Sequence, residues 1–265
     1  MMDFRDLLFG DTETTSSTPE NAKPIEVCFS FFNNDYRLMT ITERFNPHIP
    51  IPPESSAVHF IVDEDVQDKQ DFDQWFDRMR PFFMTRKYSV GHNFKYDTDV
   101  MRYAANPHLP YPEVFDDNHV LCTLKLAKKL YGNDPSFENM KLSYLWFKLG
   151  LHKTTDRNIV PHAAEDDVYM TLVVYQHLHN EMLARGIINE NSTFDDIIAF
   201  QNTPNLMACM PTGKYKGEKM ADVPTSYLEW MIESSDIIKE DNPRRDIDLA
   251  HTVLHELNLR HGFTD

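Results

Sequence analysis

The 265-residue sequence is poor in cysteine and lacks any long apolar run. Its three cysteines, Cys28, Cys122 and Cys209, are far apart and form no Cys-x-x-Cys pair, which favours a reducing compartment over a disulfide framework. No apolar run approaches the length that spans a bilayer, and the N-terminus lacks the pattern of a signal peptide. We therefore expect a soluble, cytoplasmic protein that does not associate with membranes.

Basic residues are also scarce: 26 Lys and Arg stand against 42 Asp and Glu, for a formal net charge of -16. This balance argues against a protein that coats nucleic acid with a broad basic face, because Lys and Arg supply non-specific affinity for phosphate. It leaves open an enzyme that grips a strand end and meets the phosphate charge with metal ions. The length suits one sizeable domain with an appendage, or two domains.

Hydrophobic periodicity predicts strands first and helices later. Residues 4–10, 25–31 and 36–41 have strand patterns with short connections, which favours an antiparallel meander. Residues 88–91 predict another strand that leads directly into a helix carrying Asp97, and apolar residues at helical spacing follow. This order predicts an α/β domain with a mixed sheet.

The composition changes beyond residue 186. We expect a domain over residues 1–186, a linker over 187–205 and a small α-rich C-terminal module over 206–265. Within the module, residues 213–217 form a glycine-bounded turn, and amphipathic segments follow it.

The chemistry centres on Asp11-Thr12-Glu13. On an extended strand, residues two apart point the same way, so Asp11 and Glu13 project together from the strand's end. Two bare carboxylates would repel each other, and a hard divalent cation with oxygen ligands removes that cost. Such a triplet is also compatible with a plain acidic turn, because strand ends are often polar.

Two further segments place a carboxylate beside the end of an element. Asp97 follows His92-Asn93 at the strand-to-helix junction. Asp167 lies five residues after His162, at the start of a long predicted helix. Asp166 offers an alternative register one residue earlier.

This ordered pattern resembles the histidine branch of the DEDD superfamily of 3′-to-5′ exonucleases. Asp11-Thr12-Glu13 matches its first motif, residues 92–97 are similar to the second, and His162 with Asp167 is similar to the third. The resemblance implies a ribonuclease H-like mixed sheet flanked by helices. Residues 210–230 resemble the C-terminal module of exodeoxyribonuclease X-like proteins, although Thr212 stands where that module usually has an aromatic residue.

The resemblance implies a two-metal reaction. Two Mg²⁺ ions about 4 Å apart, or Mn²⁺ in their place, activate a water on one side of a phosphodiester and stabilise the leaving 3′ oxygen on the other. Asp11 would bridge both ions, and Glu13, Asp97 and Asp167 would complete their shells, with Glu13 also near the terminal 3′-hydroxyl. His162 would be the general base, since the ordinary pKa of histidine lies near working pH. The products would be nucleoside 5′-monophosphates.

Further residues are candidates for substrate binding: Thr14, Thr15, His92, Asn93, Lys214 and Lys216. The two threonines either hydrogen-bond the terminal nucleotide or satisfy their own turn. Asn93 has an alternative role as the cap of the helix that follows it. The lysines, together with Tyr215, suit either a single-strand contact or a plain basic turn.

The leading hypothesis is a metal-dependent 3′-to-5′ exonuclease acting on DNA 3′ ends, single- or double-stranded, with replication or repair proteins as partners. One alternative is a 3′-to-5′ exoribonuclease. Another is an inactive module that binds nucleic-acid ends or a replication complex. The presence of all four carboxylates and His162 argues against the inactive module.

Overall fold

The computed structural model describes residues 2–160, 162–242 and 245–262 of the chain. The chain divides into two compact units, each with its own apolar core. The N-terminal unit comprises Met1–Leu130 and Phe137–Gln201, and the C-terminal unit comprises Tyr131–Ser136 and Asn202–Asp265. The short segment Tyr131–Ser136 thus belongs to the C-terminal unit although it interrupts the sequence of the N-terminal one.

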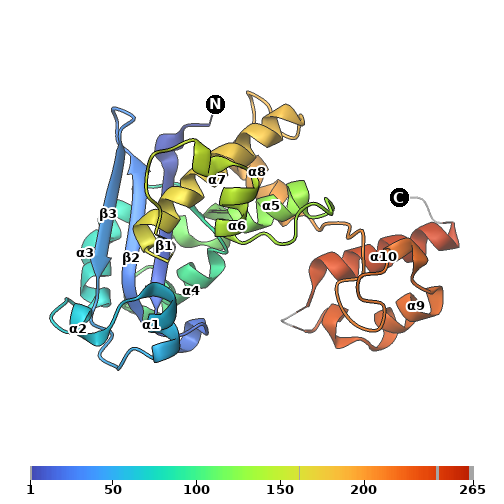
Figure 1. Ribbon diagram of the computed structural model, residues 1–265, viewed down its shortest axis with the longest axis horizontal. Helices are drawn as coiled ribbons and strands as arrows, with labels where there is room; N and C mark the ends of the chain where they lie inside the picture. Colours follow the sequence, from blue (N-terminus) through green and yellow to red (C-terminus); the bar gives the residue numbers. More distant parts are fainter. Residues whose placement is uncertain (1, 161, 243–244, 263–265) are drawn as a thin grey trace. The chain divides into compact units, whose positions relative to one another are not determined.

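A five-stranded mixed sheet forms the centre of the N-terminal unit (Figure 1). The strand order is β3-β2-β1-β4-β5, in which β1, β2 and β3 are antiparallel and β4 and β5 run parallel to β1. The bounds are β1 Leu7–Thr14, β2 Pro24–Phe32, β3 Leu38–Arg44, β4 Tyr88–Gly91 and β5 Val120–Cys122. The predicted mixed sheet is confirmed. Its first strand begins at Leu7 instead of residue 4, because Phe4–Asp6 form a 3₁₀ turn capped by the Asp3 carboxylate.

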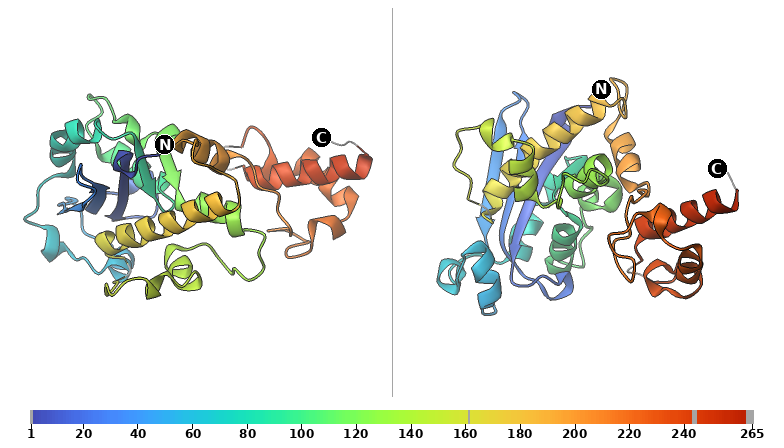
Figure 2. Two further views of the ribbon diagram at one scale, coloured as in Figure 1. Left: turned by 90° about the horizontal axis from the view of Figure 1, so that it is seen from above. Right: turned by 45° about the vertical axis from the view of Figure 1, so that its right-hand side comes forward.

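Helices cover both faces of this sheet (Figure 2). On one face lies α7 (Ala164–Ala184), whose Tyr175 ring centre is 6.0 Å from that of Phe9 in β1. The opposite face packs against α3 (Phe72–Phe83) and α4 (Lys95–Ala104) in the main apolar core. The remaining helices of this unit are α1 Pro53–His59, α2 Asp63–Val66, α5 Thr123–Tyr131, α6 Leu142–Lys148 and α8 Phe194–Asn202.

Helix α8 lies within the range for which we predicted a linker, residues 187–205. It packs on the N-terminal unit, where Phe194 contacts Tyr88. Its buried Gln201 forms hydrogen bonds with the backbone of the edge strand β5. The Gln201 carboxamide accepts a hydrogen bond from Cys122 N–H at 2.8 Å and donates one to Val120 C=O at 2.7 Å. This side chain therefore pairs with the edge strand as a further strand would.

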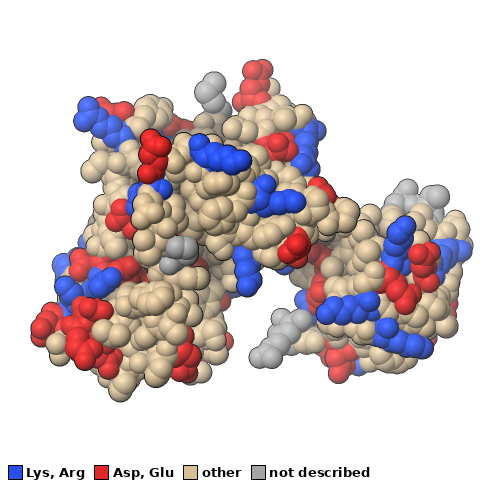
Figure 3. Space-filling view, viewed as in Figure 1, with Lys and Arg blue, Asp and Glu red and all other residues tan. Residues whose placement is uncertain are grey.

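The C-terminal unit is α-helical, with α9 (Thr225–Ser234) and α10 (Ile247–His261) around a small core. Within the described ranges, no helix combines the length and the apolarity needed to cross a membrane. On the face drawn in Figure 3, lysine and arginine side chains are interspersed with aspartate and glutamate.

Candidate active site

The carboxylates of Asp11 and Glu13 project from β1 beyond the point where its parallel neighbour ends. Strand β4 pairs with β1 only as far as Phe9, opposite Val90, whereas β2 pairs with β1 as far as Thr14, with a register shift after Glu13. Because side chains alternate along a strand, Asp11 and Glu13 share the face on which Phe9 meets α7. Thr12 points the other way, toward α4.

Asp97 fills the place left by the end of β4. Its Oδ1 accepts hydrogen bonds from the backbone N–H of Thr12 at 3.0 Å and from the Thr12 hydroxyl at 2.7 Å. The backbone N–H would otherwise lack a strand partner on this side. Asp97 is 5% exposed, so the first and second sequence motifs meet in a buried contact.

Two glycines make this approach possible by leaving room for Phe94. A Cβ at Gly10 would lie 2.9 Å from the Phe94 ring, and one at Gly91 would lie 2.1 Å from it. The fully buried ring anchors the turn between β4 and α4, one helical turn before Asp97. These glycines serve close packing, because neither has a positive φ.

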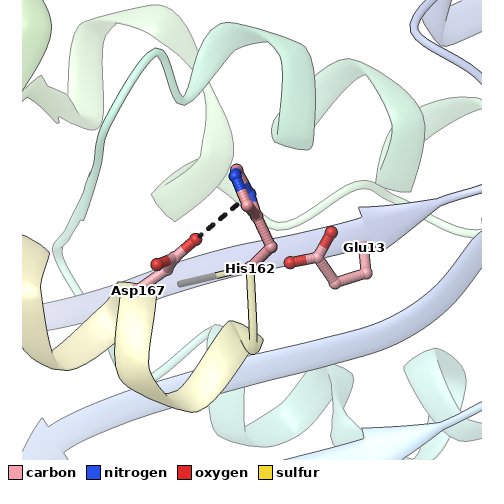
Figure 4. A group of neighbouring side chains, drawn as sticks. All are labelled: Glu13, His162 and Asp167. Carbon is pink, nitrogen blue, oxygen red and sulfur yellow. Dashed lines mark ion pairs between the residues drawn. The ribbon is translucent and has the colours of Figure 1, made fainter. Parts of the chain in front are cut away.

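The third motif enters at the first turn of α7. Glu13, His162 and Asp167 each offer a ligand atom, and these atoms all lie within 4.8 Å of one another (Figure 4). Nδ1 of His162 is 3.9 Å from Oδ2 of Asp167. The imidazole is more than half exposed, whereas the Asp167 carboxylate is 13% exposed, so the histidine stands at the solvent side of the acids.

Asp166 faces a different set of partners. Its carboxylate accepts hydrogen bonds from Arg157 Nε at 2.7 Å and from the backbone N–H of Val160 at 2.8 Å. Arg157 also bonds Glu165 at 2.9 Å. These contacts tie the loop before His162 to α7. In the structure, Asp167 is therefore the carboxylate beside Glu13, and Asp166 fastens the loop.

Ionisation of the clustered carboxylates is unfavourable without a cation. Burial, reinforced by the charges of the neighbouring acids, raises the pKa of Asp11 well above its ordinary value and that of Glu13 to about 9. Burial also raises the pKa of Asp97 to about 7, against the hydrogen bonds from Thr12, and that of Asp167 to about 6, against the attraction of His162. A cluster of buried oxygen donors that repel one another fits a hard divalent cation.

The two threonines that we considered for substrate binding already have partners within the protein. The Thr14 hydroxyl bonds Ser16 C=O at 3.0 Å and the Tyr96 hydroxyl, and Thr15 Oγ1 accepts from Lys23 N–H at 3.0 Å. Both threonines thus satisfy the turn after β1.

The second-motif polar residues are placed differently. His92 Nδ1 lies 2.9 Å from the Thr123 hydroxyl, and burial lowers its pKa to about 4, so this imidazole is neutral near pH 7. The cap prediction for Asn93 is wrong: the N-cap position belongs to Phe94, and Asn93 is exposed with a left-handed φ of 63°. Asparagine tolerates that conformation better than most residues. Lys214 and Lys216 belong to the C-terminal unit.

Three supporting contacts were not predicted. Glu26 lies opposite Glu13 in the β1–β2 register and binds Arg44 at 2.6 Å. Tyr96, one residue before Asp97, bonds the turn of Thr14. Arg157 secures the loop of His162. Only Tyr96 offered a signal in the sequence, because it belongs to the second motif. The other two contacts depend on the strand register and on the path of the loop before α7, which the sequence alone does not give.

The sheet order and the helices that flank the sheet match the fold of ribonuclease H-like exonucleases. The family model described as RNase_T, Exonuclease, matches residues 8–175. The chain therefore belongs to this exonuclease family, within the DEDD superfamily. A second model, described as "Putative quorum-sensing-regulated virulence factor", matches residues 205–235 in the C-terminal unit.

Known relatives extend this similarity. Exodeoxyribonuclease 10 of Escherichia coli K12 is 27% identical over 193 residues, which cover 72% of this chain and 75% of the relative. The structure of exonuclease X in complex with 5′ overhanging duplex DNA covers 74% of this chain and 99% of its own, with a TM-score of 0.51 and 20% identity. E. coli exonuclease I in complex with a dT13 oligonucleotide covers 68% of this chain and 42% of its own, with a TM-score of 0.52 and 16% identity. These two structures share the fold.

Proposed function

We propose that this exonuclease is metal-dependent and removes nucleotides from the 3′ ends of DNA. The observation that carries the proposal is the gathering of acids from β1, α4 and α7 beside His162. The similarity to an exodeoxyribonuclease supports DNA as the substrate. Replication or repair proteins as partners stay a prediction.

Asp11, Glu13, Asp97 and Asp167 would hold the metal, which we take to be two Mg²⁺ ions with Mn²⁺ as a substitute. Their oxygen-only donor set suits these hard cations better than zinc, which favours nitrogen and sulfur ligands. Bound there, such ions would neutralise phosphate charge and lower the pKa of a coordinated water. The raised pKa values of the acids support this assignment. Part of the rise comes from repulsion between the carboxylates, which a bound cation would relieve.

His162 would act as the general base. A water attacks the terminal phosphodiester, and the imidazole accepts its proton as the new phosphorus–oxygen bond forms. The bond from phosphorus to the 3′ oxygen of the penultimate nucleotide breaks, and that oxygen takes up a proton. The product is a nucleoside 5′-monophosphate. The exposure of His162 at the rim of the acids suits a group that must exchange protons with solvent.

The test is digestion of matched DNA and RNA strands, labelled at either the 3′ or the 5′ end, with and without Mg²⁺. We expect early release of the 3′ label as a 5′-monophosphate from DNA, and no release in EDTA. Faster digestion of the RNA strands would favour the exoribonuclease alternative. Early release of the 5′ label would overturn the proposed direction. Tight binding of ends without hydrolysis of either polymer would favour the inactive module.

A further inference from the structure

Three aromatic rings lie together in the C-terminal unit. The ring centres of Tyr215 and Tyr227 are 4.7 Å apart, and those of Tyr227 and Trp230 are 5.3 Å apart. Both tyrosines pack partly against the core of the unit, whereas Trp230 is 48% exposed. In contrast, Trp75 and Trp146 of the N-terminal unit are 5% and 2% exposed. The three rings, which we call the aromatic cluster, therefore keep an open aromatic surface.

The loop beside the aromatic cluster is held in a defined shape. Met210 N–H donates to Glu218 C=O, and Gly217 N–H donates to Met210 C=O, both at 2.8 Å. Gly213 has a φ of 77°, and a Cβ there would lie 2.6 Å from the Tyr227 hydroxyl. The position thus requires glycine on both counts. This geometry brings Lys214 Nζ to 5.1 Å from the centre of the Tyr215 ring.

The lysines of this loop differ from the other cations of the same unit. Among the described residues, Lys214, Lys216 and Lys219 form no ion pair, and all three are exposed. The remaining described lysine and arginines of the unit each have an acidic partner: Lys239 with Asp236, Arg245 with Glu240 and Arg260 with Glu256. Within the described part of the C-terminal unit, unpaired ammonium groups are thus concentrated in the loop beside an open aromatic surface.

We propose that the aromatic cluster and its loop form a second nucleic-acid site, which binds single strands without cleaving them. Exposed rings stack on the faces of unpaired bases, and adjacent lysines bind the phosphates between them. A duplex should bind less well, because its bases stack on one another and their faces are not available to the aromatic cluster. A strand bound at this second site would have a raised effective concentration at the active site. This contribution to digestion rests on the proposed function. Binding itself does not rest on it.

The binding test uses the full chain carrying Asp11→Asn, in EDTA, with single-stranded oligodeoxythymidine as the probe. Stacking on Trp230 should quench tryptophan emission, and Trp230→Phe should lose this quench while keeping most of the affinity. Trp230→Ala should weaken binding by about tenfold. Lys216→Gln should lower the slope of log affinity against log salt by about 0.7. Lys239→Gln, which removes the same charge where it already has a partner, should change the slope little.

Several outcomes would overturn the proposal. They are an equal quench with Trp230→Phe, unchanged affinity with Trp230→Ala, or stronger binding of an acidic peptide of equal charge than of the oligonucleotide. Because metal and turnover are absent from this assay, its result is independent of whether the chain proves to be a DNA exonuclease. In the active enzyme, Trp230→Ala should shorten the run of nucleotides removed per encounter with a strand.

Discussion

The two units place their polar groups in opposite ways. In the N-terminal unit, acids from three distant segments are buried against one another, at the cost of raised pKa values. In the C-terminal unit, lysines stand exposed beside rings that pack on a small core. Buried, mutually repelling charges are suited to holding cations for chemistry, and exposed cations beside rings are suited to holding a polymer. Substitutions in the first unit should therefore change turnover, and those in the second should change affinity.

The largest effect should come from Asp167→Asn, compared with Asp166→Asn on the next residue. We expect the Asp167 variant to lose detectable nucleotide release, because its carboxylate lies beside Glu13 and His162. The Asp166 variant should keep measurable activity, since that carboxylate bonds Arg157 and Val160 instead. The measurement is the single-turnover rate of 3′-label release with Mg²⁺. Full activity in the Asp167 variant would reverse the assignment of the two residues.

A smaller effect is expected from His162→Gln, which removes the proposed base and leaves the acids in place. The rate should fall by at least about a hundredfold, while the affinity for DNA in EDTA stays the same. His48→Gln serves as the control, because His48 is an exposed histidine paired with Asp71 in another loop. A rate within a few-fold of the parent enzyme would assign proton removal to another group.

The third effect concerns stability without metal. The folded-state pKa values of Asp167, Asp97 and Glu13 are raised to about 6, 7 and 9, above their unfolded values, so the folded protein holds protons that the unfolded chain releases. In EDTA the free energy of unfolding should therefore fall as the pH rises from about 4 to about 9. Asp97→Asn should unfold at a higher temperature than the parent near pH 8, by several degrees.

Thermal unfolding at constant ionic strength, with Mg²⁺ or EDTA, measures this difference. Added Mg²⁺ should stabilise the parent more than Asp97→Asn, because the variant lacks one carboxylate of the site. A variant that is less stable than the parent at pH 8 in EDTA would contradict the electrostatic account of the cluster.

Much of the fold follows from periodicity, and the exceptions have physical causes. Alternation in residues 25–31 predicts β2, because one pattern repeats over several residues. Strand β5 has three residues, Val120–Cys122, which are too few to establish a period. Helix α8 follows a polar segment and lies in the range predicted as a linker. Its attachment depends on Gln201, whose pairing with β5 is visible only in the structure.

For the site, spacing and residue type indicate which carboxylates to consider. They cannot choose between Asp166 and Asp167, since neighbours on a helix point about 100° apart and the choice depends on which side meets β1. The partner that occupies Asp166 is Arg157, in a loop without regular structure. Likewise, Gly10 and Gly91 are ordinary glycines in the sequence, and their common contact with Phe94 appears only once the strands are paired.

The smallest effect tests the division between the units directly. Deleting residues 206–265 should leave the rate of removal of one nucleotide within a few-fold of the parent, because the proposed catalytic residues all belong to the N-terminal unit. The deletion also removes hydrogen-bond partners of the segment that remains, because Asn133 bonds Leu206 C=O at 2.8 Å and Ala208 N–H at 3.0 Å.

A second variant therefore keeps the chain complete: Leu228→Asp places a charge in the core of the C-terminal unit, where Leu228 is fully buried. Both variants should remove the first nucleotide normally and bind longer strands more weakly. If both fold in the N-terminal unit, as judged by circular dichroism, and neither cleaves, the C-terminal unit takes part in the chemistry and the contrast between the two units fails.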